Sequence, residues 1–272
     1  MAIANEDKTT AGAFEDADHS ASSSYSTLTT FRPKRKVHLK VDRQASLRYL
    51  GYAQQTLDQA LIDRLEKLAC QCENELEPTF IWRIVPIDQA KSQWNEDDPR
   101  VVLKHTELQL PGKDITRHLE GASFVALTAC TLGMKSEREL RLLSSTNALD
   151  ALVWGSCANA LIEATAEEAQ KDIANEVATN GLYARMRFSP GYGDLPLSVQ
   201  PLFLKTIQAQ RNLGLTLNES NLLIPTKSIT AIVGIFDKQV ASRQAKPCHT
   251  CLAHDYCSYL EKGITCYGNT NQ

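Results

Sequence analysis

The feature that most constrains the fold is a long helical pattern without proline between residues 137 and 178. Apolar and small side chains recur there at the spacing of one helical face. The stripe consists of Leu140, Leu143, Leu149, Leu152, Val153, Cys157, Leu161 and Ala164. We therefore predict one long buried helix, with a break near the Ser-Ser-Thr-Asn stretch at 144–147.

Short β-rich runs lie on both sides of this helix, and they do not alternate with helices in a repeating βαβ order. They cover residues 80–87, 101–110, 123–129, 215–225 and 228–236. Further amphipathic helices are predicted around Leu57–Leu68 and from Ser198 to Gly214, and a shorter one contains His118. The pattern predicts an α+β fold in which an antiparallel or mixed β-sheet packs with long helices.

The composition fits a single globular body. The chain has 272 residues, 43% of them hydrophobic, and a net charge of −3. A chain of this charge offers no basic surface for nucleic acid. No apolar run reaches the roughly 18 residues that cross a bilayer, and the first residues lack the order of a secretory signal. We therefore expect a cytoplasmic protein with neither nucleic-acid nor membrane partners.

Both ends of the chain differ in composition from the middle. Residues 1–36 are rich in small, polar and acidic residues and end in a basic cluster, so we predict a disordered tail. The basic cluster is either a solvated charge run or a docking patch for an anion. Residues 37–240 form the predicted domain, and residues 241–272 form a cysteine-rich C-terminal tail.

Four of the eight cysteines lie in the C-terminal tail, namely Cys248, Cys251, Cys257 and Cys266. A CxxC pair commonly supplies two metal ligands, so these thiolates could hold an iron–sulfur cluster or a zinc ion, with His249 or His254 as replacement ligands. Free thiols on a loose tail are the alternative. The other four cysteines lie in apolar surroundings typical of small buried side chains.

A turn-rich stretch, "RFSPGYGD" at 187–194, carries the residues best suited to a small ligand. Pro190 and Gly191 can turn the chain so that backbone amides face a ligand, Arg187 can bind a carboxylate, and Tyr192 can stack on a planar ring. A plain surface loop would have the same composition. Glu163, beside the small residues of the long helix, is either a ligand contact or a solvated carboxylate.

Several motifs, in order, resemble the S-adenosylmethionine-binding activation domain of cobalamin-dependent methionine synthase, in its stand-alone form. They are "LRYLGY", "GKDITRHLEGASFVALTACTLG", "LDALVWGSCANALIEATAEE", "RFSPGYGDLPLSVQ" and "GLTLNESNLLIPTKSITAIVGI". The resemblance spans roughly residues 40–236 and implies the activation-domain fold. No tyrosine follows "SITAIVGIF", where the fused enzyme has a second aromatic contact.

The resemblance also implies a cofactor-binding site for S-adenosylmethionine. Arg187 would hold the methionine carboxylate, Phe188 and Ser189 would offer backbone groups, and Tyr192, after Gly191, would close over the ligand. Glu163 matches an acidic residue that faces the cationic end of the ligand. No residue of the chain is expected to be catalytic in its own right, because the reaction depends on positioning.

The implied function is reactivation of cobalamin-dependent methionine synthase, with S-adenosylmethionine as the methyl donor to reduced cobalamin. The chain would act as an activation subunit of a methyltransferase system. Its partner, a methionine synthase core or another corrinoid protein, would hold the cobalamin, and an electron donor protein would supply the reduction. The alternatives are a non-catalytic S-adenosylmethionine sensor that regulates a corrinoid protein, and a redox chaperone that works through the cysteine tail.

Overall fold

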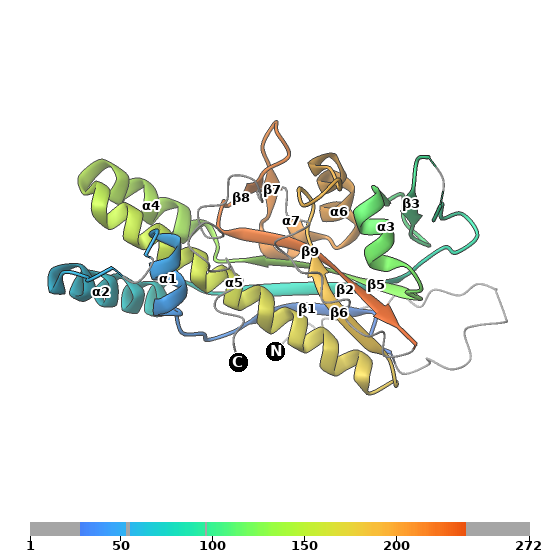
Figure 1. The fold of residues 1–272 in the computed structure, drawn as a ribbon, viewed down its shortest axis with the longest axis horizontal. Helices are drawn as coiled ribbons and strands as arrows, with labels where there is room; N and C mark the ends of the chain where they lie inside the picture. The colour runs from blue at the N-terminus through green and yellow to red at the C-terminus, as the bar shows by residue number, and fades with distance from the viewer. Residues whose placement is uncertain (1–27, 53–54, 96, 238–272) are drawn as a thin grey trace, which may run out of the picture.

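A five-stranded antiparallel sheet forms the centre of the computed structural model, which describes residues 28–52, 55–95 and 97–237. The strand order is β1-β2-β5-β9-β6, so β1 and β6 are the two edges (Figure 1). The bounds are β1 Phe31–Lys36, β2 Thr79–Pro86, β5 Phe124–Thr131, β6 Tyr183–Phe188 and β9 Ser228–Phe236. Two small hairpins pair β3 (Arg100–Val102) with β4 (Gln109–Pro111) and β7 (Thr216–Leu217) with β8 (Leu223–Ile224).

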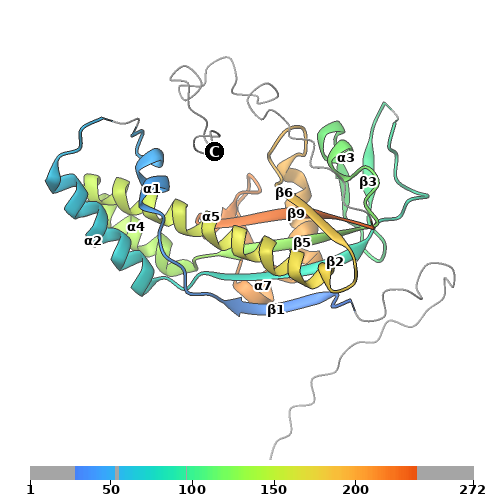
Figure 2. The ribbon, with the colours of Figure 1, turned by 60° about the horizontal axis from the view of Figure 1, so that its bottom comes forward.

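Helices cover both faces of this sheet (Figures 1 and 2). One layer contains α1 (Arg43–Tyr49), α2 (Gln59–Glu75), α4 (Met134–Thr146) and α5 (Ala148–Ala178). The opposite layer contains α3 (Lys113–Leu119), α6 (Gln200–Thr206) and α7 (Ala209–Leu213), with a 3-10 turn at Leu197–Val199 before α6. The predicted α+β class is confirmed, and the sheet is antiparallel throughout.

The central strand β5 explains why the sheet needs cover on both faces. Its side chains alternate, so that Ala126 and Cys130 belong to the hydrophobic core under α5, whereas Val125, Leu127 and Ala129 belong to the core under α3, α6 and α7. All five are fully buried. A strand with two apolar faces must lie between two layers.

The long helical pattern forms two helices that meet at Asn147. The Asn147 side chain accepts a hydrogen bond from the backbone amide of Asp150 at 3.1 Å and so caps α5. The predicted break is therefore present. Two members of the predicted buried stripe, Leu149 and Leu152, are 47% and 60% exposed. They lie at the start of α5, which extends beyond the sheet beside α2 and α4 (Figure 1).

Residues 31–36 contradict the predicted N-terminal tail, because they form strand β1 at the edge of the sheet. Two of the basic side chains that suggested a solvated segment, Arg32 and Arg35, have acidic partners on α5. Arg32 Nε donates to Asp172 Oδ2 at 3.1 Å, and Arg35 also pairs with this carboxylate. The domain therefore begins before residue 37. Of the remaining predicted tail residues, residues 1–27 lie outside the described residues, as do residues 238–272.

The predicted helix from Ser198 to Gly214 is divided in two. Ser198 lies in the 3-10 turn, and α6 begins at Gln200 without a side-chain cap. Gln208, at φ +53°, separates α6 from α7, and Gly214 ends α7 at φ +69°. In the part of the chain that the structure describes, no helix is long and apolar enough to cross a membrane.

Candidate functional site

A bulge in the edge strand β6 turns Arg187 toward α5. Ala184 pairs with Ile235 of β9 and Arg187 pairs with Val233, so three steps along β6 match two steps along β9. The extra residue puts Ala184 and Arg187 on the same face of the sheet. Phe188 then points to the opposite face, where it belongs to the second hydrophobic core.

Arg187 meets Glu163 of α5 on that face. The Arg187 Nη2 donates to Glu163 Oε2 at 2.7 Å, with the two side chains 25% and 43% exposed. The backbone amide of Arg187 donates to Gln170 Oε1 at 3.1 Å, which holds the strand against the next turns of α5. A cation and an anion therefore lie side by side at the surface, each open to solvent on one side.

Cys130 of β5 lies next to this pair in the core. Burial raises the pKa of its thiol to about 12, while Arg187 lowers it and Glu163 raises it to smaller extents. The thiol is therefore protonated at neutral pH. The thiol therefore adds no charge beside the ion pair.

The loop after β6 is a compact turn. The Gly191 amide donates to the Leu195 carbonyl at 2.8 Å, and the Tyr192 amide donates to the Ser189 carbonyl at 3.1 Å. Gly191 has φ +89°, and a Cβ there would lie 3.0 Å from the Leu197 side chain. The turn needs glycine here, but both amides bond within the loop and not toward a ligand, contrary to the expectation for Gly191.

Helix α3 holds the loop from the other side through Asp194. This carboxylate accepts hydrogen bonds from the backbone amides of Lys113 at 2.6 Å and Asp114 at 3.1 Å, at the start of α3. Gly193 allows the close approach, because a Cβ there would lie 2.6 Å from Asp114 Oδ2. Sequence reasoning missed Asp194. The available signal was Gly112 at the start of α3. Glycine has no side chain to cap the helix, so a side chain from elsewhere has to accept from its first amides.

Two edge-on or tilted ring contacts support Tyr192. The rings of His118 and Phe188, and those of Phe188 and Tyr192, have centroids 5.3 Å apart in each case. Burial, and to a smaller extent the positive charge of Arg185, lower the pKa of His118 to about 4, although the bond between its Nε2 and the Met186 carbonyl acts in the opposite direction. The imidazole is neutral at physiological pH. Tyr192 itself is 50% exposed.

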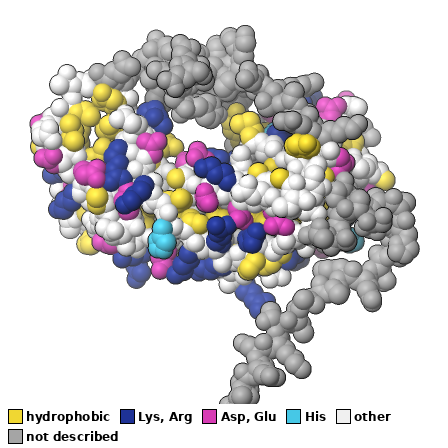
Figure 3. Space-filling view, turned by 90° about the horizontal axis from the view of Figure 1, so that it is seen from below, with side chains coloured by type: hydrophobic (Ala, Val, Ile, Leu, Met, Phe, Trp, Pro, Cys, Tyr) yellow, Lys and Arg dark blue, Asp and Glu magenta, His cyan; other side chains and the backbone are white. Residues whose placement is uncertain are grey.

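The structure thus brings the predicted site residues together in two groups. Glu163 and Arg187 form the charged pair, while Phe188, Ser189, Gly191 and Tyr192 form the adjoining strand end and turn. Figure 3 shows basic and acidic side chains side by side on the side of the molecule that it views. This arrangement offers a positive and a negative charge to one molecule, and the turn that follows the strand carries Tyr192.

The predicted metal ligands Cys248, Cys251, Cys257 and Cys266 lie outside the described residues. Within the described ranges, no group of three or more His, Cys, Asp or Glu side chains could hold a metal ion. The four other cysteines are free thiols, and Cys72, Cys130 and Cys157 are buried.

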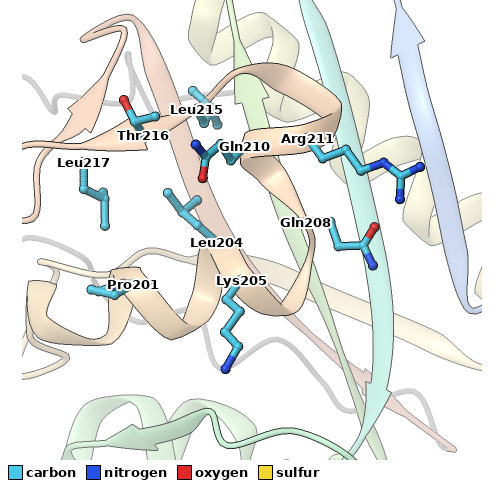
Figure 4. Close-up of a pocket in the computed structure, with 9 residues that line it drawn as sticks. All are labelled: Pro201, Leu204, Lys205, Gln208, Gln210, Arg211, Leu215, Thr216 and Leu217. Carbon is cyan, nitrogen blue, oxygen red and sulfur yellow. The ribbon is translucent and has the colours of Figure 1, made fainter.

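A separate pocket of about 620 Å³ lies on the opposite side of the sheet, at α6, α7 and β7 (Figure 4). It is lined by Pro201, Leu204, Lys205, Gln208, Gln210, Arg211, Leu215, Thr216 and Leu217. This lining contains no acidic side chain and none of the predicted site residues. Because the Glu163–Arg187 pair joins two of the predicted site residues and offers both charges, we place the candidate site there and not in the pocket.

Comparison with known proteins identifies the fold. No family model matches the sequence, and no curated protein matches it either. A solved structure, the MetH reactivation domain bound to AdoHcy, is similar with a TM-score of 0.51 and 14% sequence identity, over 74% of this chain and 78% of that one. The chain therefore has the fold of the MetH reactivation domain, as the resemblance of its motifs predicted.

Proposed function

We propose that the protein binds S-adenosylmethionine and presents its methyl group to a cobalamin held by a corrinoid partner such as a methionine synthase core. The observation that carries this proposal is the Glu163–Arg187 pair, together with the half-exposed Tyr192 in the turn that follows β6. It lies in a chain with the fold of a domain whose structure was solved with AdoHcy. Fold alone does not define a function, and the charges at the site are what support ligand binding.

The charges of the site match those of the ligand. S-adenosylmethionine carries a carboxylate, an ammonium and a sulfonium on one short chain. Arg187 is suited to the carboxylate because a guanidinium binds carboxylates through paired hydrogen bonds. Glu163, 43% exposed and next to it, is suited to the cationic groups. Tyr192 offers a ring for the adenine, and Phe188 and His118 hold that ring in place.

The site needs no general base for this reaction. The sulfonium is already an activated leaving group, and the reduced cobalamin of the partner would supply the nucleophile. The contribution of this chain is to bind the ligand and orient its methyl group toward the partner. The neutral His118 and the buried thiol of Cys130 fit this role, because neither adds a competing charge or nucleophile.

The binding step is tested by calorimetric titration with S-adenosylmethionine. Replacing Arg187 with Ala should weaken binding by about ten- to a hundredfold, since a charge-assisted hydrogen bond contributes about 1.5–3 kcal/mol. The matched control is Arg211→Ala, which removes the same side chain from the pocket on the other side of the sheet. If Arg211→Ala weakens binding and Arg187→Ala does not, the ligand binds in the pocket and our site is wrong.

The methyl-transfer step needs a separate measurement. The purified protein is mixed with a cob(II)alamin-loaded methionine synthase core, a reductant and S-adenosylmethionine, and methylcobalamin is followed by its absorption. We expect methylcobalamin to form with the wild-type protein and to form more slowly with Arg187→Ala. Tight ligand binding without any methylcobalamin would favour the sensor function over the activation subunit.

A further inference from the structure

The pocket at α6, α7 and β7 has an apolar side and a polar side. Leu204, Leu215 and Leu217 contribute most of its apolar lining, and the first two are buried. Figure 4 shows the three leucines together on the left of the pocket and the side chains of Gln208 and Arg211 on its right. Its volume of about 620 Å³ is typical of small-molecule sites, which combine apolar walls with a few polar groups.

The charged side chains that line the pocket, Lys205 and Arg211, are both cations. Lys205 Nζ lies 3.1 Å from Glu107 Oε2, and both side chains are largely exposed, so this ion pair is weak. Arg211 forms no hydrogen bond or ion pair within the part of the chain that the structure describes. A guanidinium binds oxyanions through paired hydrogen bonds. The polar side of the pocket is therefore suited to an anion.

Gln208 has a backbone conformation that glycine adopts more easily than any other residue. Its φ of +53° and ψ of +40° turn the chain between α6 and α7. A residue with a side chain adopts this conformation only at an energetic cost, and such strain is common at binding sites. The turn places the Gln208 amide on the same side of the pocket as Arg211 (Figure 4), where it can donate to the same anion.

We infer that this pocket is a second ligand site, which takes a small organic anion with an apolar body. The anionic group would bind at Arg211 and Gln208, and the apolar body would lie over the leucines. The inference does not depend on the proposed function. S-adenosylmethionine does not belong to this ligand class, because it carries two positive charges and one negative charge and would meet only cations in the lining.

Two fluorescent probes that differ in one charge test the inference. 8-Anilinonaphthalene-1-sulfonate carries a sulfonate on an apolar ring system, and N-phenyl-1-naphthylamine is the same ring system without the sulfonate. Each probe is titrated into the wild-type protein and into Arg211→Ala. We expect the variant to bind the sulfonate probe about three- to tenfold more weakly and the neutral probe with unchanged affinity.

Three further variants test the two sides of the pocket and the specificity of the effect. Gln208→Gly should weaken the sulfonate probe without lowering the melting temperature, because glycine adopts the turn conformation without strain. Leu217→Asn should weaken both probes, because it places a polar amide on the apolar side. Arg141→Ala removes an exposed guanidinium from α4, in the opposite layer, and should change neither affinity. Melting temperatures establish that each variant is folded.

The outcomes separate this inference from the proposed function. If the wild-type protein binds neither probe, or if Arg211→Ala binds the sulfonate probe as tightly as the wild type, the inference is wrong. Displacement of the sulfonate probe by S-adenosylmethionine would also overturn it and would move the S-adenosylmethionine site into the pocket. Binding of the sulfonate probe at Arg211 by a protein that does not bind S-adenosylmethionine would support the pocket and contradict the proposed function.

Discussion

Each residue of the candidate site depends on contacts from distant parts of the chain. Arg187 meets a carboxylate 24 positions earlier in the sequence, and the loop that follows it is held by the start of α3 about 80 positions earlier. His118 of that helix packs on Phe188. Tyr192 thus packs on Phe188, which in turn packs against the partly buried imidazole of His118.

His118 should make the stability of the protein depend on pH. Its pKa is about 4 in the folded protein, against an ordinary value near 6.5, so between these values the unfolded chain binds more protons than the folded one. The free energy of unfolding should therefore be independent of this group above pH 6.5 and decrease as the pH falls toward 4, by up to about 3 kcal/mol. Urea denaturation between pH 7.5 and pH 4.5 measures the decrease.

The matched variant for this prediction is His118→Gln, which cannot titrate but can still donate to the Met186 carbonyl. Its stability should fall less steeply than that of the wild-type protein over the same pH range. Parallel curves for the two proteins would mean that His118 is protonated as easily in the folded state as in the unfolded chain.

Among the elements, the edge strand β1 is joined to the last turns of α5 by ion pairs. Asp172 near the end of α5 accepts hydrogen bonds from Trp82 Nε1 at 2.8 Å and from Arg32 Nε at 3.1 Å, and it also pairs with Arg35. The carboxylate is only 9% exposed. Lys36 also pairs with Glu77. Most of the basic side chains that suggested a docking patch for an anion therefore form ion pairs with acidic residues of the fold.

Deleting residues 1–36 should accordingly destabilise the protein. The deletion removes β1 and leaves the Asp172 carboxylate buried without its cations, which typically costs about 3–5 kcal/mol. Deleting residues 1–27 is the control, because it removes none of the contacts described above. Thermal unfolding of the two truncated proteins provides the comparison. Equal melting temperatures would show that β1 contributes nothing and would restore the predicted boundary at residue 37.

At the scale of the whole molecule, the antiparallel sheet separates two hydrophobic cores, and the candidate site lies at the edge where β6 meets α5. The cysteine-rich tail is a separate question, because residues 238–272 lie outside the described part. The S-adenosylmethionine contacts that we propose involve residues 163–192 alone. Ligand binding and metal binding should therefore be separable properties of the chain.

The tail prediction is that Cys248, Cys251, Cys257 and Cys266 hold one metal site. Anaerobically purified protein should be brown if the site is an iron–sulfur cluster, or colourless with about one zinc per chain. Replacing Cys251 with Ser should remove the metal, since a hydroxyl is a poorer ligand than a thiolate, and should leave S-adenosylmethionine binding unchanged. Elemental analysis that finds neither iron nor zinc in the wild-type protein would favour free thiols.

The sequence by itself was sufficient for the elements whose pattern is local. The 3.6-residue periodicity indicated α5 and its break at Asn147, and the β-rich runs indicated β2, β5 and β9, because burial of one face imposes a period along the chain. The motifs also indicated the fold that the structural comparison supports.

Only the tertiary structure decided how these elements meet. The bulge that turns Arg187 toward Glu163 depends on the register between β6 and β9, and the cap that Asp194 provides depends on α3 lying beside the loop. Strand β1 was missed because its basic side chains look solvated until Asp172 is placed beside them. These contacts join residues far apart in the chain, so the spacing of residues within one element cannot predict them. They stabilise the protein only after the helices have packed on the sheet and brought the charges together.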